Sequence, residues 1–142
     1  MRMCRWVMNE PKMYFEDEKE SNEILEEWKS RLFLSDWNIK LIEEDKLGEE
    51  RAGQAEVQWV SSSGIIRMLT QKAIEDVGPV IEKQPQELIL IHELLHFKYM
   101  SVENVGSIEG VYYEESQHRL LEQMAKSLYM TKYDLNYEWF KI

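Results

Sequence analysis

Two histidines and a glutamate lie close together in the chain, in the segment His92-Glu93-Leu94-Leu95-His96. On an α-helix, residues four positions apart lie on one face, one turn from each other. The imidazoles of His92 and His96 could therefore share one metal ion. The carboxylate of Glu93, beside the first histidine, could then act on a water molecule that the metal activates. This spacing predicts a metal centre with hydrolytic chemistry.

The surroundings of this motif favour a metal site over an ordinary polar helix face. The motif lies in an apolar run from Glu87 to Phe97, and the chain has only 3 histidines, of which the motif contains two. Burying two imidazoles and a carboxylate among aliphatic side chains costs free energy unless they have partners. A metal ion would be such a partner. A buried, hydrogen-bonded histidine pair is the alternative.

A third metal ligand is expected outside the motif, because a catalytic zinc usually has three protein ligands and one position for water. The most plausible source is the helix predicted over 111–130. Its candidates are His118, Glu114 and Glu115. Further candidates lie in and near the preceding loop, namely Glu103 and Glu109.

Helical phase orders these candidates. The predicted core stripe of the second helix consists of Leu120, Leu121, Met124 and Leu128. His118 and Glu114 lie nearer to this stripe than Glu115 does. Glu122, four residues after His118, could accept a hydrogen bond from the second ring nitrogen, as an orienting partner of a metal-bound histidine would. We therefore expect His118 as the third ligand, with Glu114 or Glu115 as the alternative.

Residues around the motif would complete the chemistry. Glu93 is the expected general base, which takes a proton from water and later delivers it to the leaving group. Tyr112 and Tyr113 could donate to an oxyanion, although aromatic packing at a helix start explains them better. Extended substrates can pair with the edge of a sheet. The segment Ile65 to Thr70 is the candidate edge, and a central position in the sheet is its alternative.

The rest of the chain alternates between helical and extended patterns. Apolar residues at three- and four-residue spacing predict helices over 18–33, 84–99 and 111–130. Alternating apolar and polar residues predict strands over 36–43, 55–60 and 65–70. The last two strands would form a hairpin around the turn 61–64. Loops are expected over 45–53 and 101–110, and the segment 70–77 fits neither pattern.

This order predicts a single α+β domain over residues 1–142. It would have an N-terminal helix, a small antiparallel or mixed sheet, a central helix with the motif, and a following helix with the third ligand. Residues 1–17 form a lead-in without a clear pattern. The aromatic tail, from Tyr133 to Ile142, is expected to pack on the domain or on a partner.

Composition narrows the functional classes. The formal net charge is −10 and the sequence pI is about 4.8, which disfavours binding to nucleic acids and to anionic membranes. The single cysteine, Cys4, excludes an intrachain disulfide and fits a reducing compartment. The first residues contain no apolar stretch typical of a secretory leader. We therefore expect a cytoplasmic protein without a membrane span.

The motif and its context resemble the zincin metallopeptidases, over roughly residues 20 to 130. The short length and the His-Glu-Leu-Leu-His sequence look like minimal gluzincin-type domains of phage and prophage origin, and like ImmA/IrrE-like peptidases. This resemblance implies one zinc ion per chain, proteolysis, and a protein substrate inside the cell. It also implies a glutamate as third ligand, which would be Glu114 or Glu115. The metzincin pattern is absent, since Phe97-Lys98-Tyr99-Met100 follows the motif.

Together these features predict a zinc metallopeptidase of narrow specificity that acts on a protein or peptide. The alternative is a non-catalytic, zincin-like binding module whose metal is structural or absent. A metal-dependent amidase with a non-protein substrate is a third possibility. Glu93 favours catalysis, because a structural metal site needs no general base. Other divalent ions also suit histidine and carboxylate ligands.

Overall fold

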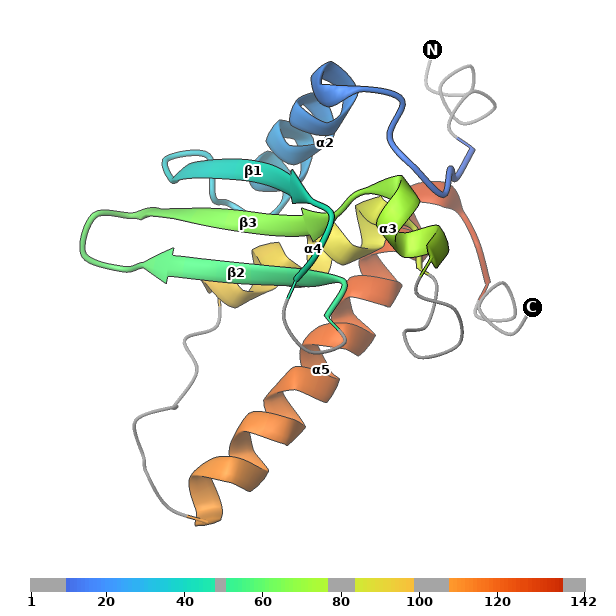
Figure 1. Cartoon of the computed structure of the whole chain (residues 1–142). Helices are drawn as coiled ribbons and strands as arrows, with labels where there is room; N and C mark the ends of the chain where they lie inside the picture. The colour runs from blue at the N-terminus through green and yellow to red at the C-terminus, as the bar shows by residue number, and fades with distance from the viewer. Residues whose placement is uncertain (1–9, 48–50, 77–83, 99–107, 137–142) are drawn as a thin grey trace.

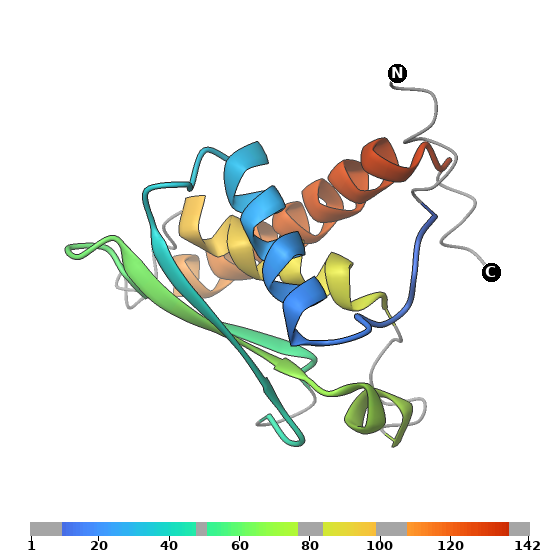
Figure 2. The ribbon, with the colours of Figure 1, turned by 90° about the horizontal axis from the view of Figure 1, so that it is seen from above.

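The fold is α+β, as predicted. The computed structural model describes residues 10–47, 51–76, 84–98 and 108–136, with the side chains of the last range described from Ser116 onward. Three helices lie on the same side of a small sheet, and a short helix follows the last strand (Figures 1 and 2). In chain order the elements are α2 (Glu18–Arg31), β1 (Asn38–Glu44), β2 (Gly53–Gln58), β3 (Ser63–Leu69), α3 (Gln71–Asp76), α4 (Gln86–Lys98) and α5 (Ile108–Tyr133).

The sheet is mixed and has the strand order β1-β3-β2. β3 pairs in parallel with β1, so that Ile66 lies beside Leu41, and antiparallel with β2, so that Ile66 also lies beside Ala55. The predicted hairpin between β2 and β3 is therefore confirmed. The expectation that Ile65 to Thr70 forms a free edge is wrong, because β3 is the central strand. Its central position explains why Ile66 and Met68 are fully buried.

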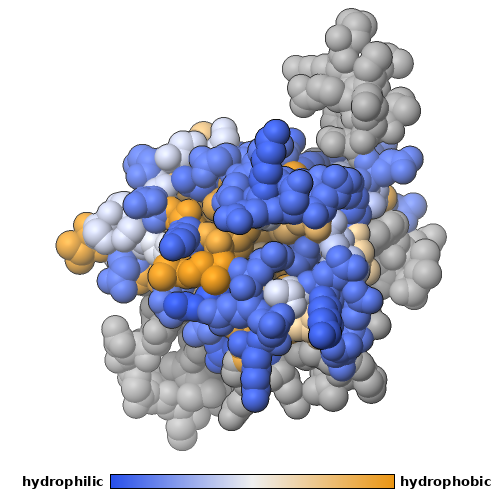
Figure 3. Space-filling model, turned by 45° about the horizontal axis from the view of Figure 1, so that its top comes forward, coloured by the Kyte–Doolittle hydropathy of each residue, from blue (hydrophilic) through white to orange (hydrophobic). Residues whose placement is uncertain are grey.

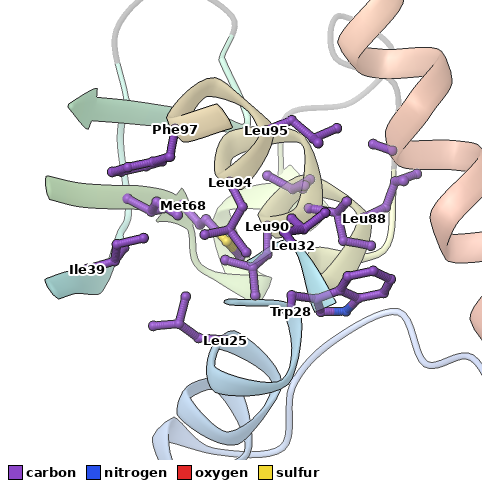
Figure 4. Packing of buried hydrophobic residues seen from close by; sticks show 14 of the residues in the cluster. Leu25, Trp28, Leu32, Ile39, Met68, Leu88, Leu90, Leu94, Leu95 and Phe97 are labelled. Atoms are coloured by element: carbon purple, nitrogen blue, oxygen red, sulfur yellow. The ribbon is translucent and has the colours of Figure 1, made fainter. Parts of the chain in front are cut away.

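The helix α2 begins and ends as its sequence dictates. Asp17 accepts a hydrogen bond from the backbone N–H of Glu20 (2.8 Å), which caps the first turn. Acidic residues in the first turn and basic residues in the last turn complement the helix dipole. Leu25 and Trp28 lie one turn apart on the buried face of this amphipathic helix, which packs toward α4 (Figure 4).

The helix α4 is the centre of the molecule. It contacts β2 and β3 of the sheet, α2 and α5. Nearly every side chain from Pro85 to Phe97 is consequently buried, and aliphatic residues occur all around the helix. Leu90, Leu94 and Phe97 point into the core that α4 shares with its neighbours (Figure 4). Phe97 also packs so closely on β3 that a side chain at Gly64 would collide with it.

The helix α5 runs antiparallel to α4 and buries a narrower stripe than predicted. From Ser116 onward its buried residues recur at three- and four-residue spacing and are Leu121, Ala125, Tyr129 and Lys132. Leu120, expected in the core, is 50% exposed, and Met124 and Leu128 are only partly buried. The difference arises because α5 touches the domain along one narrow line. The wide core stripe predicted from helical phase is therefore wrong for Leu120.

Several boundaries differ from the sequence-based expectation. The ambiguous segment after β3 forms α3, and α5 begins at Ile108, within the stretch 101–110 that was expected to be a loop. The structure does not describe 101–107, so that part of the prediction is untested. Cys4, most of the lead-in and the end of the aromatic tail also lie outside the described residues.

The surface agrees with the acidic composition. Hydrophilic side chains cover most of the face in Figure 3, and a smaller hydrophobic patch lies among them. The large hydrophobic residues that remain exposed in the described part of the chain are Met13, Phe33, Trp59, Val60 and Leu120. No helix in the described ranges is both long and apolar enough to span a membrane.

A buried carboxylate joins the three long helices. Glu87, at the start of α4, accepts hydrogen bonds from Nε1 of Trp28 (2.7 Å), from Nζ of Lys132 (2.6 Å) and from the hydroxyl of Tyr133. Lys132 also contacts Glu27 Oε1 of α2 at 2.9 Å. Glu87 and Lys132 are both nearly inaccessible to solvent. Each charge therefore depends on the other, since removing one member of a buried pair leaves an uncompensated charge.

Replacing this lysine should destabilise the fold strongly. Lys132→Met would leave the carboxylate of Glu87 buried without its cation, and we expect the free energy of unfolding to fall by about 3 kcal/mol or more in urea titrations. The double variant Glu87→Gln/Lys132→Met should lose less. Lys126→Met is the matched control, because Lys126 lies on the same helix beside Glu122 in a partly exposed pair. That control should change stability by less than about 1 kcal/mol, and an equal loss in both variants would contradict this account.

Candidate metal centre

In the buried part of α4, only the two motif histidines are accessible to solvent. From Pro85 to Phe97 every residue is buried except His92 and His96, which are partly exposed. They lie one helical turn apart, and their ring centroids are 5.3 Å apart. The neighbouring turns of α4 are covered by the sheet and by α2. This central helix therefore presents two imidazoles toward α5 and toward solvent.

His118 of α5 joins this pair. Its ring centroid lies 4.6 Å from that of His92 and 5.9 Å from that of His96. His118 precedes Leu121 by three residues, so it continues the stripe with which α5 packs on the domain. It is itself exposed. Helix α5 thus brings to the two motif histidines the residue that was predicted as their first-choice partner.

The three imidazoles fit one metal ion. One ring nitrogen from each residue can be chosen so that all three lie within 4.8 Å of one another. A tetrahedral zinc with Zn–N bonds of about 2.0–2.1 Å needs nitrogens about 3.3 Å apart. Small side-chain rotations would close the remaining gap. Three imidazoles are also a known ligand set of catalytic zinc, which leaves a fourth position open.

The electrostatics of His92 suit a metal ligand. Burial, and to a smaller extent the neighbouring His118 and His96, together lower the pKa of His92 to about 3. The imidazole of His92 is therefore neutral at physiological pH, and a neutral ring has a nitrogen lone pair for a cation.

Glu93, next to His92 in sequence, packs against the sheet. It is 7% exposed and lies against Gly53, the first residue of β2. Burial raises the pKa of its carboxyl to about 8, while the positive charge of Arg51 acts in the opposite direction. Neither Gly53 nor Arg51 was expected at the site. Their place in the chain, in a predicted loop about 40 residues before the motif, carried no signal for it.

Other predicted site residues fall into two groups. The side chains of Glu114, Glu115, Tyr112 and Tyr113 lie outside the described residues, as do Glu103 and the side chain of Glu109. Glu122 is described, and it accepts a hydrogen bond from Nε2 of Gln84 at 3.4 Å and lies 3.7 Å from Nζ of Lys126. No hydrogen bond joins Glu122 to His118 in the described part of the chain, so its expected orienting role is not seen.

Comparisons with known proteins do not add to this site. Searches against protein-family models, curated proteins and solved structures found no significant match to the chain. Function is therefore inferred from the motif, the histidine cluster and the surroundings of Glu93.

The buried acid should make the metal-free protein sensitive to pH. The pKa of Glu93 is about 8 in the folded chain and near 4.5 in the unfolded chain. Between these values the folded state binds more protons, so this residue lowers the free energy of unfolding as pH rises. Glu93→Met removes that effect. In urea titrations with a chelator, we compare the free energy of unfolding of Glu93→Met with that of the parent. The difference in favour of the variant should grow by on the order of 2 kcal/mol between about pH 5 and about pH 8.

The exposed residue Glu75 offers a matched control for this measurement. Glu75→Met should give the same stability difference from the parent at both pH values. A constant difference for Glu93→Met as well would show that the carboxyl of Glu93 does not titrate abnormally.

Proposed function

We propose that this protein is a zinc-dependent hydrolase, most simply a metallopeptidase with a zincin-like arrangement of helices. The observation that supports this best is the convergence of His92, His96 and His118, whose ring nitrogens lie within 4.8 Å of one another. His92 and His96 come from the motif, and His118 comes from the next helix. These residues would hold one zinc ion per chain.

The zinc ion and Glu93 would have separate roles in the reaction. When bound, zinc supplies a water of lowered pKa and polarises the carbonyl group to be cleaved. Glu93 would take the proton from the attacking water and then deliver it to the leaving amine. The raised pKa of Glu93, about 8, suits such an exchange, because a general base works best when its pKa is close to the working pH.

The edge of β2 is the natural place for an extended peptide. In the described sheet β2 pairs with β3 on one side only, so its other edge retains unpaired backbone groups. The first residue of this strand, Gly53, lies beside Glu93. A peptide that added to this edge would gain main-chain hydrogen bonds and lie next to the general base. The edge role first expected for Ile65 to Thr70 thus passes to β2.

Two features favour catalysis over a purely structural metal. Among the described residues the ligand cluster has three members, and a catalytic site keeps its fourth position for water, whereas structural sites are closed. The carboxyl group of Glu93 is buried, although burying an acid costs stability. A metal site that only supported the fold, or a module that only bound a partner, would gain nothing from Glu93.

Zinc binding can be tested residue by residue. The purified parent should bind about one zinc ion per chain. His92→Ala, His96→Ala and His118→Ala should each weaken binding by about a hundredfold or more, beyond the loss typical of a supporting partner. Competition with a chromogenic chelator measures this. Arg119→Ala, at an exposed position of α5 next to His118, is the control and should bind like the parent. Full affinity in His118→Ala would assign the third ligand to Glu114 or Glu115.

The general base can be tested separately from the metal. Glu93→Gln should keep one zinc ion but lose peptide hydrolysis by about 100-fold to 10,000-fold, because the amide cannot accept the proton. Turnover of a peptide library, followed by mass spectrometry, measures the loss. Activity of Glu93→Gln near that of the parent would refute the mechanism. Zinc binding without hydrolysis by the parent would favour the binding-module alternative.

A further inference from the structure

Gly53 lies directly against the side chain of Glu93. A Cβ atom added to Gly53 would lie 2.9 Å from Oε2 and 3.1 Å from Cγ of Glu93, and 2.7 Å from Cγ2 of Ile89. Non-bonded carbon and oxygen atoms do not normally approach so closely. Ile89 and Glu93 are both buried, at 4% and 7% exposure. The start of β2 therefore has room for a hydrogen atom at this position but not for a methyl group.

The backbone itself does not require glycine here. Gly53 pairs with Met68 in the regular ladder between β2 and β3, and its φ lies outside the left-handed region. In such a strand position glycine is unfavourable, because it loses more conformational freedom on folding than other residues do. The side chains of α4, and not the backbone conformation, therefore exclude a larger residue.

The two side chains that Gly53 meets come from one turn of α4. Ile89 and Glu93 are four residues apart, so Gly53 lies over a single face of that helix. His92, beside Glu93 in sequence, leaves the same turn toward α5. The distance between β2 and α4 at Gly53 thus limits where the carboxylate can lie relative to the histidines.

We infer that Gly53 is a positioning residue for Glu93. Its missing side chain lets β2 approach α4 closely, so that the carboxylate of Glu93 lies against the first residue of the outer strand on which a peptide would bind. The catalytic part of this inference rests on the proposed hydrolase function. The contact between Gly53 and Glu93 does not, and it can be tested in metal-free protein.

The first experiment is a double-mutant cycle on thermal stability, with a chelator present. Gly53→Ala should lower the melting temperature by several degrees in the parent, because the new methyl group displaces Glu93 and Ile89. In the Glu93→Ala background the same substitution should lower it clearly less, since one of the two obstructing side chains is gone. Equal losses in both backgrounds would overturn the inference.

The second experiment measures hydrolysis by the zinc-loaded protein. Gly53→Ala should bind zinc like the parent, with a kcat lowered by about tenfold to a hundredfold and a KM changed by less than about threefold. Glu93→Asp shortens the acid by one methylene group and should relieve the collision. Gly53→Ala/Glu93→Asp should therefore lose less kcat than the product of the two single losses, whereas strictly multiplicative losses would refute a positioning role.

Two controls separate positioning from damage to the fold. Gln54→Ala changes the next residue of β2, whose side chain points to the opposite side of the strand, and should keep the melting temperature close to the parent value. Gly53→Ala/Ile89→Leu relieves only the apolar collision and should recover stability without recovering kcat. Recovery of kcat in this variant would assign the effect to Ile89.

Absence of hydrolysis in the parent would count against the proposed function. The double-mutant cycle on thermal stability would still decide whether Gly53 and Glu93 are in contact.

Discussion

The buried carboxylate of Glu87 fixes how α5 lies against α4, and the cluster of His92, His96 and His118 depends on that fit. Glu87 is held by Lys132 and Tyr133 from the end of α5 and by Trp28 from α2. Because the two helices are antiparallel, this contact at one end determines which residues of α5 face the motif further along. A shift of α5 by one residue would turn His118 by about 100° around its helix axis and separate it from His92 and His96.

The centre itself conflicts with the stability of the fold. His92 and Glu93 lie in a helix that is largely buried, and burial shifts the pKa of each toward its neutral form. The lowered pKa of His92 reduces the stability of the fold at acidic pH, and the raised pKa of Glu93 reduces it at higher pH. A cation shared by three imidazoles would offset part of this cost, because ligand binding to the folded state alone stabilises it. Perturbed groups that gather at one place in this way are typical of functional sites.

The mixed sheet gives the site a second wall. Since β3 takes the central position, β2 becomes an outer strand, and its first residue meets α4 at Glu93. One strand thus approaches the proposed general base and also retains an unpaired edge. The close approach at Gly53 makes the position of the acid depend on the sheet as well as on its own helix. Catalysis and substrate binding would therefore share one element.

Local patterns in the sequence were sufficient for the three strands, the long helices and the motif, but not for α3 or for the start of α5. The spacing of His92 and His96 places both on one helix face wherever that helix lies, and alternating residues determined the β2–β3 hairpin, because both effects act between near neighbours. The strand order, the exposure of Leu120 and the contact between Gly53 and Glu93 arise from packing between segments distant in sequence. Tertiary structure alone decided these features, and it also brought His118 to the motif, since a one-residue change in helix register would have placed another side chain there.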